Sequence, residues 1–281
     1  MGVWIMAGVT FREAARKKLL WMAFLAGLAF LALFGTGMHL QVKGFEGHSH
    51  RNVPPIVYRQ ILMGILLVGF YAVDLLAVLM TILTSVDTIS GEIGSGTIQA
   101  IATKPIPRWQ LLIGKWIGFA GMSASYVAVM FAGVSAVGYF IGSIVPPHVF
   151  RGAALVFLEC LLVLTITLLC GTWFATITNG AIVLGLHGLA FLGGWIEQIG
   201  ALTDSQNLVT VGVVASLLMP SESVWRRAVF EMQSTFTRSL TQQIGPFSNA
   251  SAPSRTMIGY AVAYLLVALS IALYHFHKRD L

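Results

Sequence analysis

The chain has 281 residues, of which 57% are hydrophobic and only 10% are charged, and its mean hydropathy is +0.81. An ordinary soluble domain holds roughly 25% charged residues, so this composition excludes a soluble protein and indicates an integral membrane protein. The formal net charge of +6 fits topology and contact with lipid headgroups better than nucleic-acid binding, because the basic residues are not interleaved with aromatic residues on a polar surface.

The amino-terminal arm, residues 1–18, is predicted to form an amphipathic helix. Apolar and small residues recur on one side at helical spacing, namely Trp4, Gly8, Phe11, Ala15 and Leu19. Charged residues gather on the other side, namely Arg12, Glu13, Arg16 and Lys17. Such a helix can lie in the headgroup layer with its charges toward water. A disordered basic flank is the alternative.

Six apolar tracts are long enough to cross a bilayer as helices, at residues 19–40, 61–86, 111–142, 153–177, 181–200 and 257–276. We therefore expect an all-α polytopic membrane protein with a single domain over residues 1–281. The first tract is longer than the apolar part of a signal peptide, so we expect it to remain as the first span. The distribution of Lys and Arg near the span ends predicts that both termini are cytoplasmic, in a cell membrane.

A polar stretch, residues 92–115, separates the second and third tracts. Unpaired backbone groups in hydrocarbon are costly, so this stretch should lie at a membrane surface, within a segment of residues 87–110. Gly91, Gly94 and Gly96 free the backbone to leave the second span and turn. Lys104 and Pro105 then end a short helix that we expect over residues 98–103. The stretch therefore predicts a small stiff helix between two hinges, suited to docking on a partner.

These residues resemble the signature of permease subunits of ABC-2 type exporters, especially the six-span group that includes the permease of the nitrous-oxide-reductase maturation transporter. The matching residues are Glu92, Gly96, Thr97, Ile98, Pro105, Arg108, Gly114 and Lys115. The sequence departs from the usual pattern at Ile98, Ala100 and Pro107. The departures leave the predicted docking role intact and say nothing about the cargo.

The resemblance implies a permease that couples ATP hydrolysis on a separate ATPase subunit to export of a cargo. The 98–103 helix would be the coupling helix that docks on the ATPase, with the 1–18 elbow helix near it. The residues expected to make that coupling are Glu92, Gly96, Thr97, Ile98, Ile101, Pro105 and Arg108. The resemblance also implies a second permease copy, either the same chain in a homodimer or a similar permease.

Nucleotide hydrolysis is not expected on this chain. A phosphate-binding loop has the form GxxxxGK[ST], whereas Gly114 and Lys115 are followed by Trp116 and lack the earlier glycine. We expect no catalytic residue, cofactor or metal site, and we interpret the loop histidines as solvated. Two alternatives to a permease stay open: a non-transporting membrane scaffold that the same ATPase drives, and, with less support, an intramembrane enzyme.

Three acidic residues fall inside the apolar tracts. Asp74 and Glu159 lie deep in theirs, and each fits either a structural hydrogen bond or a cargo path. Glu197 is near a span end, where it can reach headgroups. Lys115, at the start of the third span, is interpreted as a residue that snorkels to the surface.

Small residues and cysteines in the tracts bear on packing. The glycine pairs 114/118 and 138/142 have the GxxxG spacing, which favours close helix packing within one chain or across a dimer. Cys160 and Cys170 would lie about 15 Å apart on one helix, too far for a disulfide.

The interval 201–256 has two interpretations. Its apolar part, residues 208–219, is too short to span a bilayer upright, and residues 224–236 could form an amphipathic helix. We expect an extracytoplasmic loop that caps the spans, with a re-entrant or partial span as the rival. Asn249 and Arg226 would then be extracytoplasmic, and Arg108 and Lys278 cytoplasmic.

Overall fold

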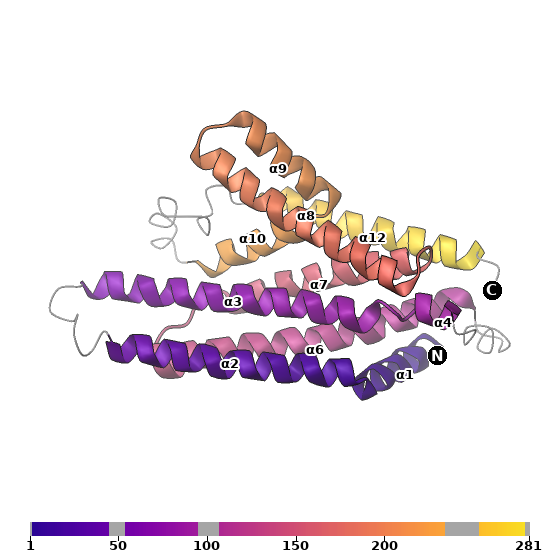
Figure 1. Ribbon diagram of the computed structural model, residues 1–281, viewed down its shortest axis with the longest axis horizontal. Helices are drawn as coiled ribbons and strands as arrows, with labels where there is room; N and C mark the ends of the chain where they lie inside the picture. The colour runs from indigo at the N-terminus through magenta and orange to yellow at the C-terminus, as the bar shows by residue number, and fades with distance from the viewer. Residues whose placement is uncertain (1, 45–53, 95–106, 234–252, 279–281) are drawn as a thin grey trace.

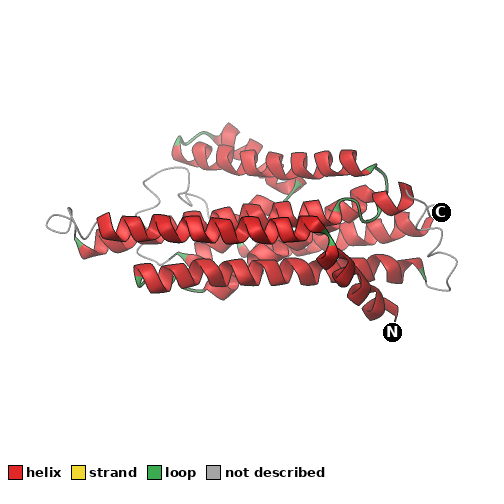
Figure 2. Cartoon of the chain, turned by 60° about the horizontal axis from the view of Figure 1, so that its bottom comes forward, coloured by secondary structure: helices red, strands yellow, loops and turns green. Residues whose placement is uncertain are grey.

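The computed structural model describes residues 2–44, 54–94, 107–233 and 253–278, and the description below refers to them. They fold into helices and connecting turns (Figure 2). The helices are α1 (Gly2–Arg16), α2 (Lys18–Gly44), α3 (Pro55–Ser85), α4 (Ser90–Gly94), α6 (Arg108–Gly142), α7 (Val149–Gly171), α8 (Thr176–Leu202), α9 (Gln206–Leu218), α10 (Ser221–Met232) and α12 (Arg255–Lys278). The all-α expectation is confirmed.

Six helical segments are long and apolar enough to cross a membrane: α2, α3 continued through α4, α6, α7, α8 and α12. They correspond one to one with the six predicted tracts. α6 has 35 residues and is therefore about 50 Å long, well beyond the roughly 30 Å of a hydrocarbon core. It ends where Ser143 adopts a left-handed φ of 52° and its N–H donates to the carbonyl oxygen of Gly138.

Both described ends of the chain lie at the same end of the bundle, together with α4 and the beginning of α6 (Figure 1). The carboxyl-terminal end of α2, the beginning of α3 and the turn after α6 lie at the opposite end. Six spans require this arrangement, because an even number of crossings returns the chain to the side from which it began.

The core of the bundle is built around α7. Leu162, Val163 and Leu164 on this helix are fully buried, and α7 packs against α3, α6, α8, α10 and α12. Large apolar side chains face outward elsewhere; Leu33 on α2 is 73% exposed and Phe140 on α6 is 80% exposed. This distribution suits a chain whose outer surface meets lipid.

Helix α1 packs against the first half of α6 through small residues. Its buried positions are Ala7, Thr10 and Ala14, and of these Ala7 and Thr10 meet Gly114 and Gly118 of α6. Trp4 and Phe11, on the predicted apolar face, are exposed instead, Trp4 by 74%. The elbow region is therefore a helix that holds its own chain with small residues and leaves its aromatic residues outside.

The glycine pairs of α6 serve packing within the chain. A Cβ on Gly114 or Gly118 would overlap α1, one on Gly138 would lie 2.9 Å from a methyl carbon of Leu66, and one on Gly142 would lie 2.7 Å from Cε of Met38. The intrachain interpretation of both GxxxG pairs accounts for these contacts. Cys160 and Cys170, both buried, are free.

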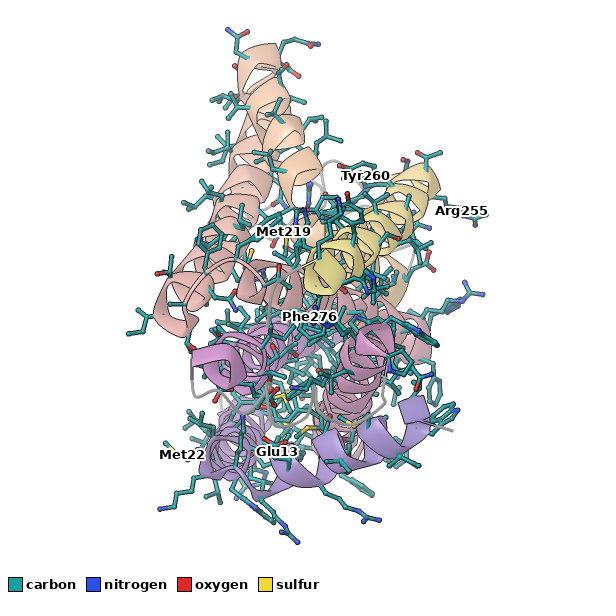
Figure 3. The ribbon with its side chains drawn as sticks, turned by 90° about the vertical axis from the view of Figure 1, so that its right-hand side faces the viewer. Glu13, Met22, Met219, Arg255, Tyr260 and Phe276 are labelled. Carbon is teal, nitrogen blue, oxygen red and sulfur yellow. The ribbon has the colours of Figure 1, made fainter. Side chains whose placement is uncertain are left out.

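Helices α8 and α9 form a hairpin that projects from the bundle (Figure 1). Gly193, Gly200 and Gly212 let the two helices touch; a Cβ on Gly200 would lie 2.7 Å from the backbone nitrogen of Val209. The chain then bends by 105° between α9 and α10, near Met219, which lies deep between α9 and α12 in Figure 3.

Helix α10 runs from the middle of the bundle toward the end of the bundle at which α7 begins. The hydroxyl of Ser221, the first residue of α10, lies 3.2 Å from Nδ1 of His187 in the middle of α8. Met232, the last residue of α10, packs against Gly152 near the start of α7. Helices α9 and α10 thus lie alongside the spans instead of over their ends. Of the two interpretations of the interval 201–256, these contacts favour the re-entrant or partial span.

Candidate coupling site

Only part of the predicted coupling set lies in the described residues. Glu92 lies in α4 and Arg108 is the first residue of α6, so they flank the segment 95–106. The other predicted members, Gly96, Thr97, Ile98, Ile101 and Pro105, lie outside the described residues. The predicted 98–103 helix lies there too.

One hinge prediction is wrong. Gly91 was expected to free the backbone for the turn out of the second span, yet it lies inside α4, whereas Gly94 is the last residue of that helix. The chain turns earlier, at residues 86–89, between α3 and α4. At this turn the hydroxyl of Ser90 donates to the carbonyl oxygen of Val86 at 2.9 Å.

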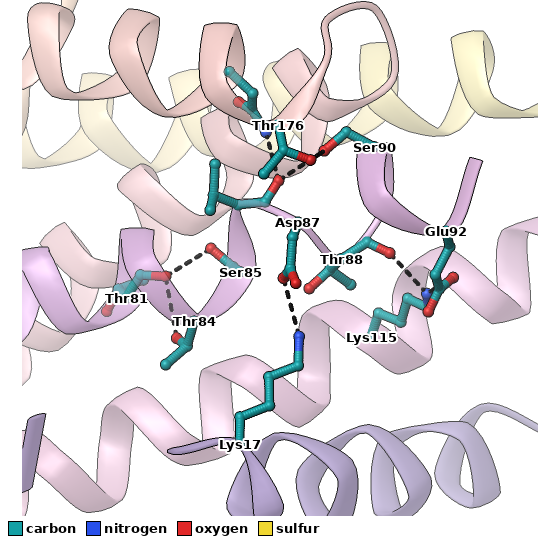
Figure 4. Close-up of polar contacts among 12 residues, drawn as sticks. Lys17, Thr81, Thr84, Ser85, Asp87, Thr88, Ser90, Glu92, Lys115 and Thr176 are labelled. Atoms are coloured by element: carbon teal, nitrogen blue, oxygen red, sulfur yellow. Dashed lines mark hydrogen bonds and ion pairs between the residues drawn. The ribbon is translucent and has the colours of Figure 1, made fainter. Parts of the chain in front are cut away.

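Glu92 forms an ion pair with Lys115 of α6. Lys115 Nζ also donates to the carbonyl oxygen of Thr88 at 3.2 Å (Figure 4). Lys115 is only 4% exposed, so the prediction that it snorkels to the surface is wrong. A buried ammonium needs a paired anion, and α4 supplies that anion from a distant part of the sequence. The ion pair therefore fixes α4 on α6.

A second ion pair attaches the end of α1 to the turn before α4. Lys17 Nζ lies 3.0 Å from Oδ1 of Asp87. Both side chains are partly exposed, 26% and 46%, so this pair is worth about 0–1 kcal/mol. Its effect is to set the position of the turn relative to α1.

The other side of the turn is tied to α7 and α8. The hydroxyls of Ser90 and Thr176 lie 2.9 Å apart (Figure 4). Asn179, fully buried in α8, donates through Nδ2 to the carbonyl oxygens of Val86 at 3.0 Å and Thr167 at 3.1 Å. Sequence reasoning missed Asn179, because its neighbours in the sequence do not indicate which carbonyl groups it meets.

Arg108 connects the start of α6 with the end of α12. Its Nη1 donates to the carbonyl oxygen of His277 at 3.2 Å. A cation near the last carbonyl groups of a helix is favoured by the helix dipole. The beginning of α6 therefore touches the carboxyl-terminal span as well as the turn that precedes α4.

A cavity of about 10 Å³ lies between α1, the turn and α6, lined among others by Glu13, Lys17, Glu92 and Lys115. Roughly 10–15 Å³ is needed to hold a single water, so this cavity is too small for a cargo. The candidate coupling site, defined as Lys17, Asp87, Thr88, Ser90, Glu92 and Lys115, is thus a set of polar attachments between helices.

The two deep acidic residues lie elsewhere. Asp74 on α3 and Glu159 on α7 come together in the middle of the bundle, 4% and 0% exposed. Glu197 does not reach the surface as expected; its Oε2 accepts a hydrogen bond from Nη2 of Arg226 at 2.7 Å. Among the described residues, no group of histidine, cysteine and acidic side chains has the geometry of a metal site.

The comparisons with known proteins agree with the signature. A family model described as ABC-2 family transporter protein matches residues 4–281. No curated protein matches the chain. The likeness to the nitrous-oxide-reductase maturation group stays a prediction, because the matching model describes the family as a whole. With the match extending over nearly the full length, the chain belongs to the ABC-2 family of transporter proteins and is the membrane component, the permease, of an ABC transporter.

Proposed function

We propose that this permease exports its cargo with energy from ATP hydrolysis on a separate ATPase subunit that docks on the segment 95–106. The observation that carries the proposal is the ion pair between Glu92 and Lys115. This ion pair holds α4, which directly precedes the segment, on α6, which begins shortly after the segment. Both flanks of the docking segment are therefore fixed to the same span.

A movement of the docking segment would pass directly into the spans. Toward α6 it passes through Lys115, which also holds the carbonyl oxygen of Thr88. Toward α8 it passes through the contact of Ser90 with Thr176. Packed helices and charged hydrogen bonds resist deformation, so α4 and its neighbours would move as a unit.

Helix α1 fits the role of the elbow helix. It is packed on α6 at Gly114 and Gly118, and Lys17 ties its end to Asp87. Its exposed Trp4 suits the boundary between headgroups and acyl chains, where amphipathic aromatic residues concentrate. We place this end of the bundle, with both termini, on the cytoplasmic side of the cell membrane.

The transport pathway would be completed by a second permease, either a second copy of this chain or a similar one. The support is the family and the exposed apolar faces of α2 and α8, where Leu33 and Leu192 are 73% and 58% exposed. Lipid would cover the faces that the second permease does not.

A charge-swap experiment tests the coupling role. In Glu92→Lys two ammonium groups would meet, and in Lys115→Glu two carboxylates would meet; a buried charge without its partner typically costs about 3–5 kcal/mol. Glu92 keeps 18% of its side chain exposed, so the cost here should fall toward the lower end. We expect each single variant to insert in the membrane but lose most of the ATPase activity that the permease stimulates in the co-purified ATPase.

The double variant Glu92→Lys with Lys115→Glu restores the opposite charges and should recover a large part of the stimulation. Arg12→Glu is the matched control, because Arg12 is exposed on α1 and its charge reversal should change little. Full stimulation in both single variants, or equal loss in the single and double variants, would contradict the proposed coupling. Cargo movement into vesicles, measured alongside, separates a permease from a scaffold that the same ATPase drives.

A further inference from the structure

Four helices bring titratable side chains together in the middle of the bundle, away from the coupling site. They are Asp74 on α3, Glu159 on α7, His187 on α8 and Glu222 on α10, and each is at most 9% exposed. Asp74 lies thirteen residues before Asp87 of the coupling site, which is about 20 Å along the helix axis. The coupling described above makes no use of this cluster.

The carboxyl groups of Asp74 and Glu159 lie within hydrogen-bonding reach of each other. Neither oxygen of Glu159, nor Oδ1 of Asp74, has a donor among the described residues. A carboxylate oxygen can only accept a hydrogen bond, whereas a protonated carboxyl can also donate one. A hydrogen bond between these two groups therefore requires a proton on one of them.

Among the described residues, the side chains around the pair supply no strong counter-charge to it. Nδ1 of His187 is 4.0 Å from Oε1 of Glu159, but the same nitrogen is 3.2 Å from the hydroxyl of Ser221. The guanidinium of Arg226 donates instead to Glu197. The other titratable groups that face the pair from its packed helices are Tyr71, Cys160 and Glu222, and none of them is a cation.

Two ionised carboxylates side by side in a buried site would repel each other, so a pair of this kind is favoured when its two groups hold one proton between them. The three oxygens without a donor each expose less than 1 Å², which leaves no access for a hydrated ion or for a cargo group. Among the described residues the cluster also lacks the geometry of a metal site. A proton is the one ligand that these contacts admit.

We propose that Asp74 and Glu159 form a proton-binding site, in which the two carboxyl groups hold a single proton between them inside the membrane domain. Binding transfers one proton from hydronium to one carboxylate oxygen, so one O–H bond of hydronium breaks as the carboxyl O–H bond forms and a water molecule is released. The proton removes one of two like charges and provides the donor that the pair lacks. Four separate spans and partial spans meet at this site, so the proton also holds α3 against α7 beneath α10.

Infrared spectroscopy of the full-length permease, purified and reconstituted in lipid vesicles at neutral pH, tests the site. A protonated carboxyl group has a carbonyl stretching band that a carboxylate lacks. We expect the double variant Asp74→Asn with Glu159→Gln to lose the intensity of one such group relative to the unchanged chain. The amides keep the size and supply the donor, so the variant should fold.

Glu231→Gln is the matched control, because Glu231 lies on the neighbouring α10 but is ion-paired with Arg227, so the spectrum of this variant should keep the band. No loss in the double variant, a loss equal to two groups, or loss of the same band in Glu231→Gln would overturn the proposal. Should the double variant fail to insert, each single variant must shift or weaken the band, and an unchanged band in both would overturn it. The experiment needs no ATPase, so its outcome is independent of the proposed coupling.

Discussion

Gly118 of α6 lies at a close contact between α1 and the spans. A Cβ at this position would lie 2.8 Å from Cβ of Thr10 and 2.9 Å from the carbonyl oxygen of Ala7. Neither atom is at the end of a flexible side chain, so neither can turn away. In Gly118→Ala, α1 must therefore retreat by about 0.6 Å to reach the 3.4 Å at which ordinary contact begins.

The magnitude follows from comparison with Gly121, three residues further along the same helix. Its nearest neighbours are two ring carbons of Phe11, at 3.8 and 4.0 Å from the added Cβ, which is ordinary contact. Overpacking costs about 1–3 kcal/mol, while replacing Gly by Ala inside a helix gains about 1 kcal/mol. The gain is common to both positions, so Gly118→Ala should be less stable than Gly121→Ala by about 1–3 kcal/mol.

Thermal melting of the purified permease in one detergent compares the two variants, and limited trypsin digestion reports on α1 itself. We expect Gly118→Ala to melt at a lower temperature than Gly121→Ala and to be cleaved faster after Arg12 and Arg16. Equal melting temperatures and equal cleavage rates would refute the assignment of Gly118 as the contact that seats α1 on α6.

Two further changes probe the far end of the bundle and the orientation. Arg226→Met would remove the guanidinium that lies 2.7 Å from the buried carboxylate of Glu197, and denaturant titrations should show a loss of about 3–5 kcal/mol in the free energy of unfolding. Arg151→Met, at a side chain that is 67% exposed, should lose only about 0–1 kcal/mol. Similar losses in the two variants would contradict the role of burial. An impermeant thiol reagent applied outside cells should label Thr203→Cys, in the turn after α8, and spare Lys278→Cys, and the reverse pattern would show that the orientation is inverted.

The spans could be predicted because the bilayer imposes a length and a polarity that are visible in one dimension. The ends of the spans were harder to predict. The fourth tract was predicted to reach residue 177, but α7 ends at Gly171 and a turn precedes α8. Trp173 and Phe174 lie in that turn and are exposed. Their apolar character continues the tract in the sequence although the backbone has already left the helix.

Polar partners from distant segments could not be predicted. Lys115 was expected to reach the surface because Glu92, which pairs with it, is 23 residues away. Glu222 and Arg226 lay in the interval interpreted as a cap, so nothing in the sequence placed them beside Glu159 and Glu197. The small face of α1 was missed for a related reason: Ala7 and Thr10 gain close contact by packing against glycines of another helix.

The partners of Asn179 show why the coupling site and the buried carboxyl pair belong to one mechanical unit. Its amide joins the carbonyl oxygen of Val86, at the start of the turn, to that of Thr167 on α7. Thr167 lies eight residues after Glu159, about 12 Å along the same helix. A displacement of the turn therefore acts on α7 through a side chain that is fully buried, and α7 cannot shift relative to α3 without changing the separation of Asp74 and Glu159. Because the energy of a carboxyl pair depends steeply on that separation when water is absent, the proton is placed where a small helix movement has a large electrostatic effect.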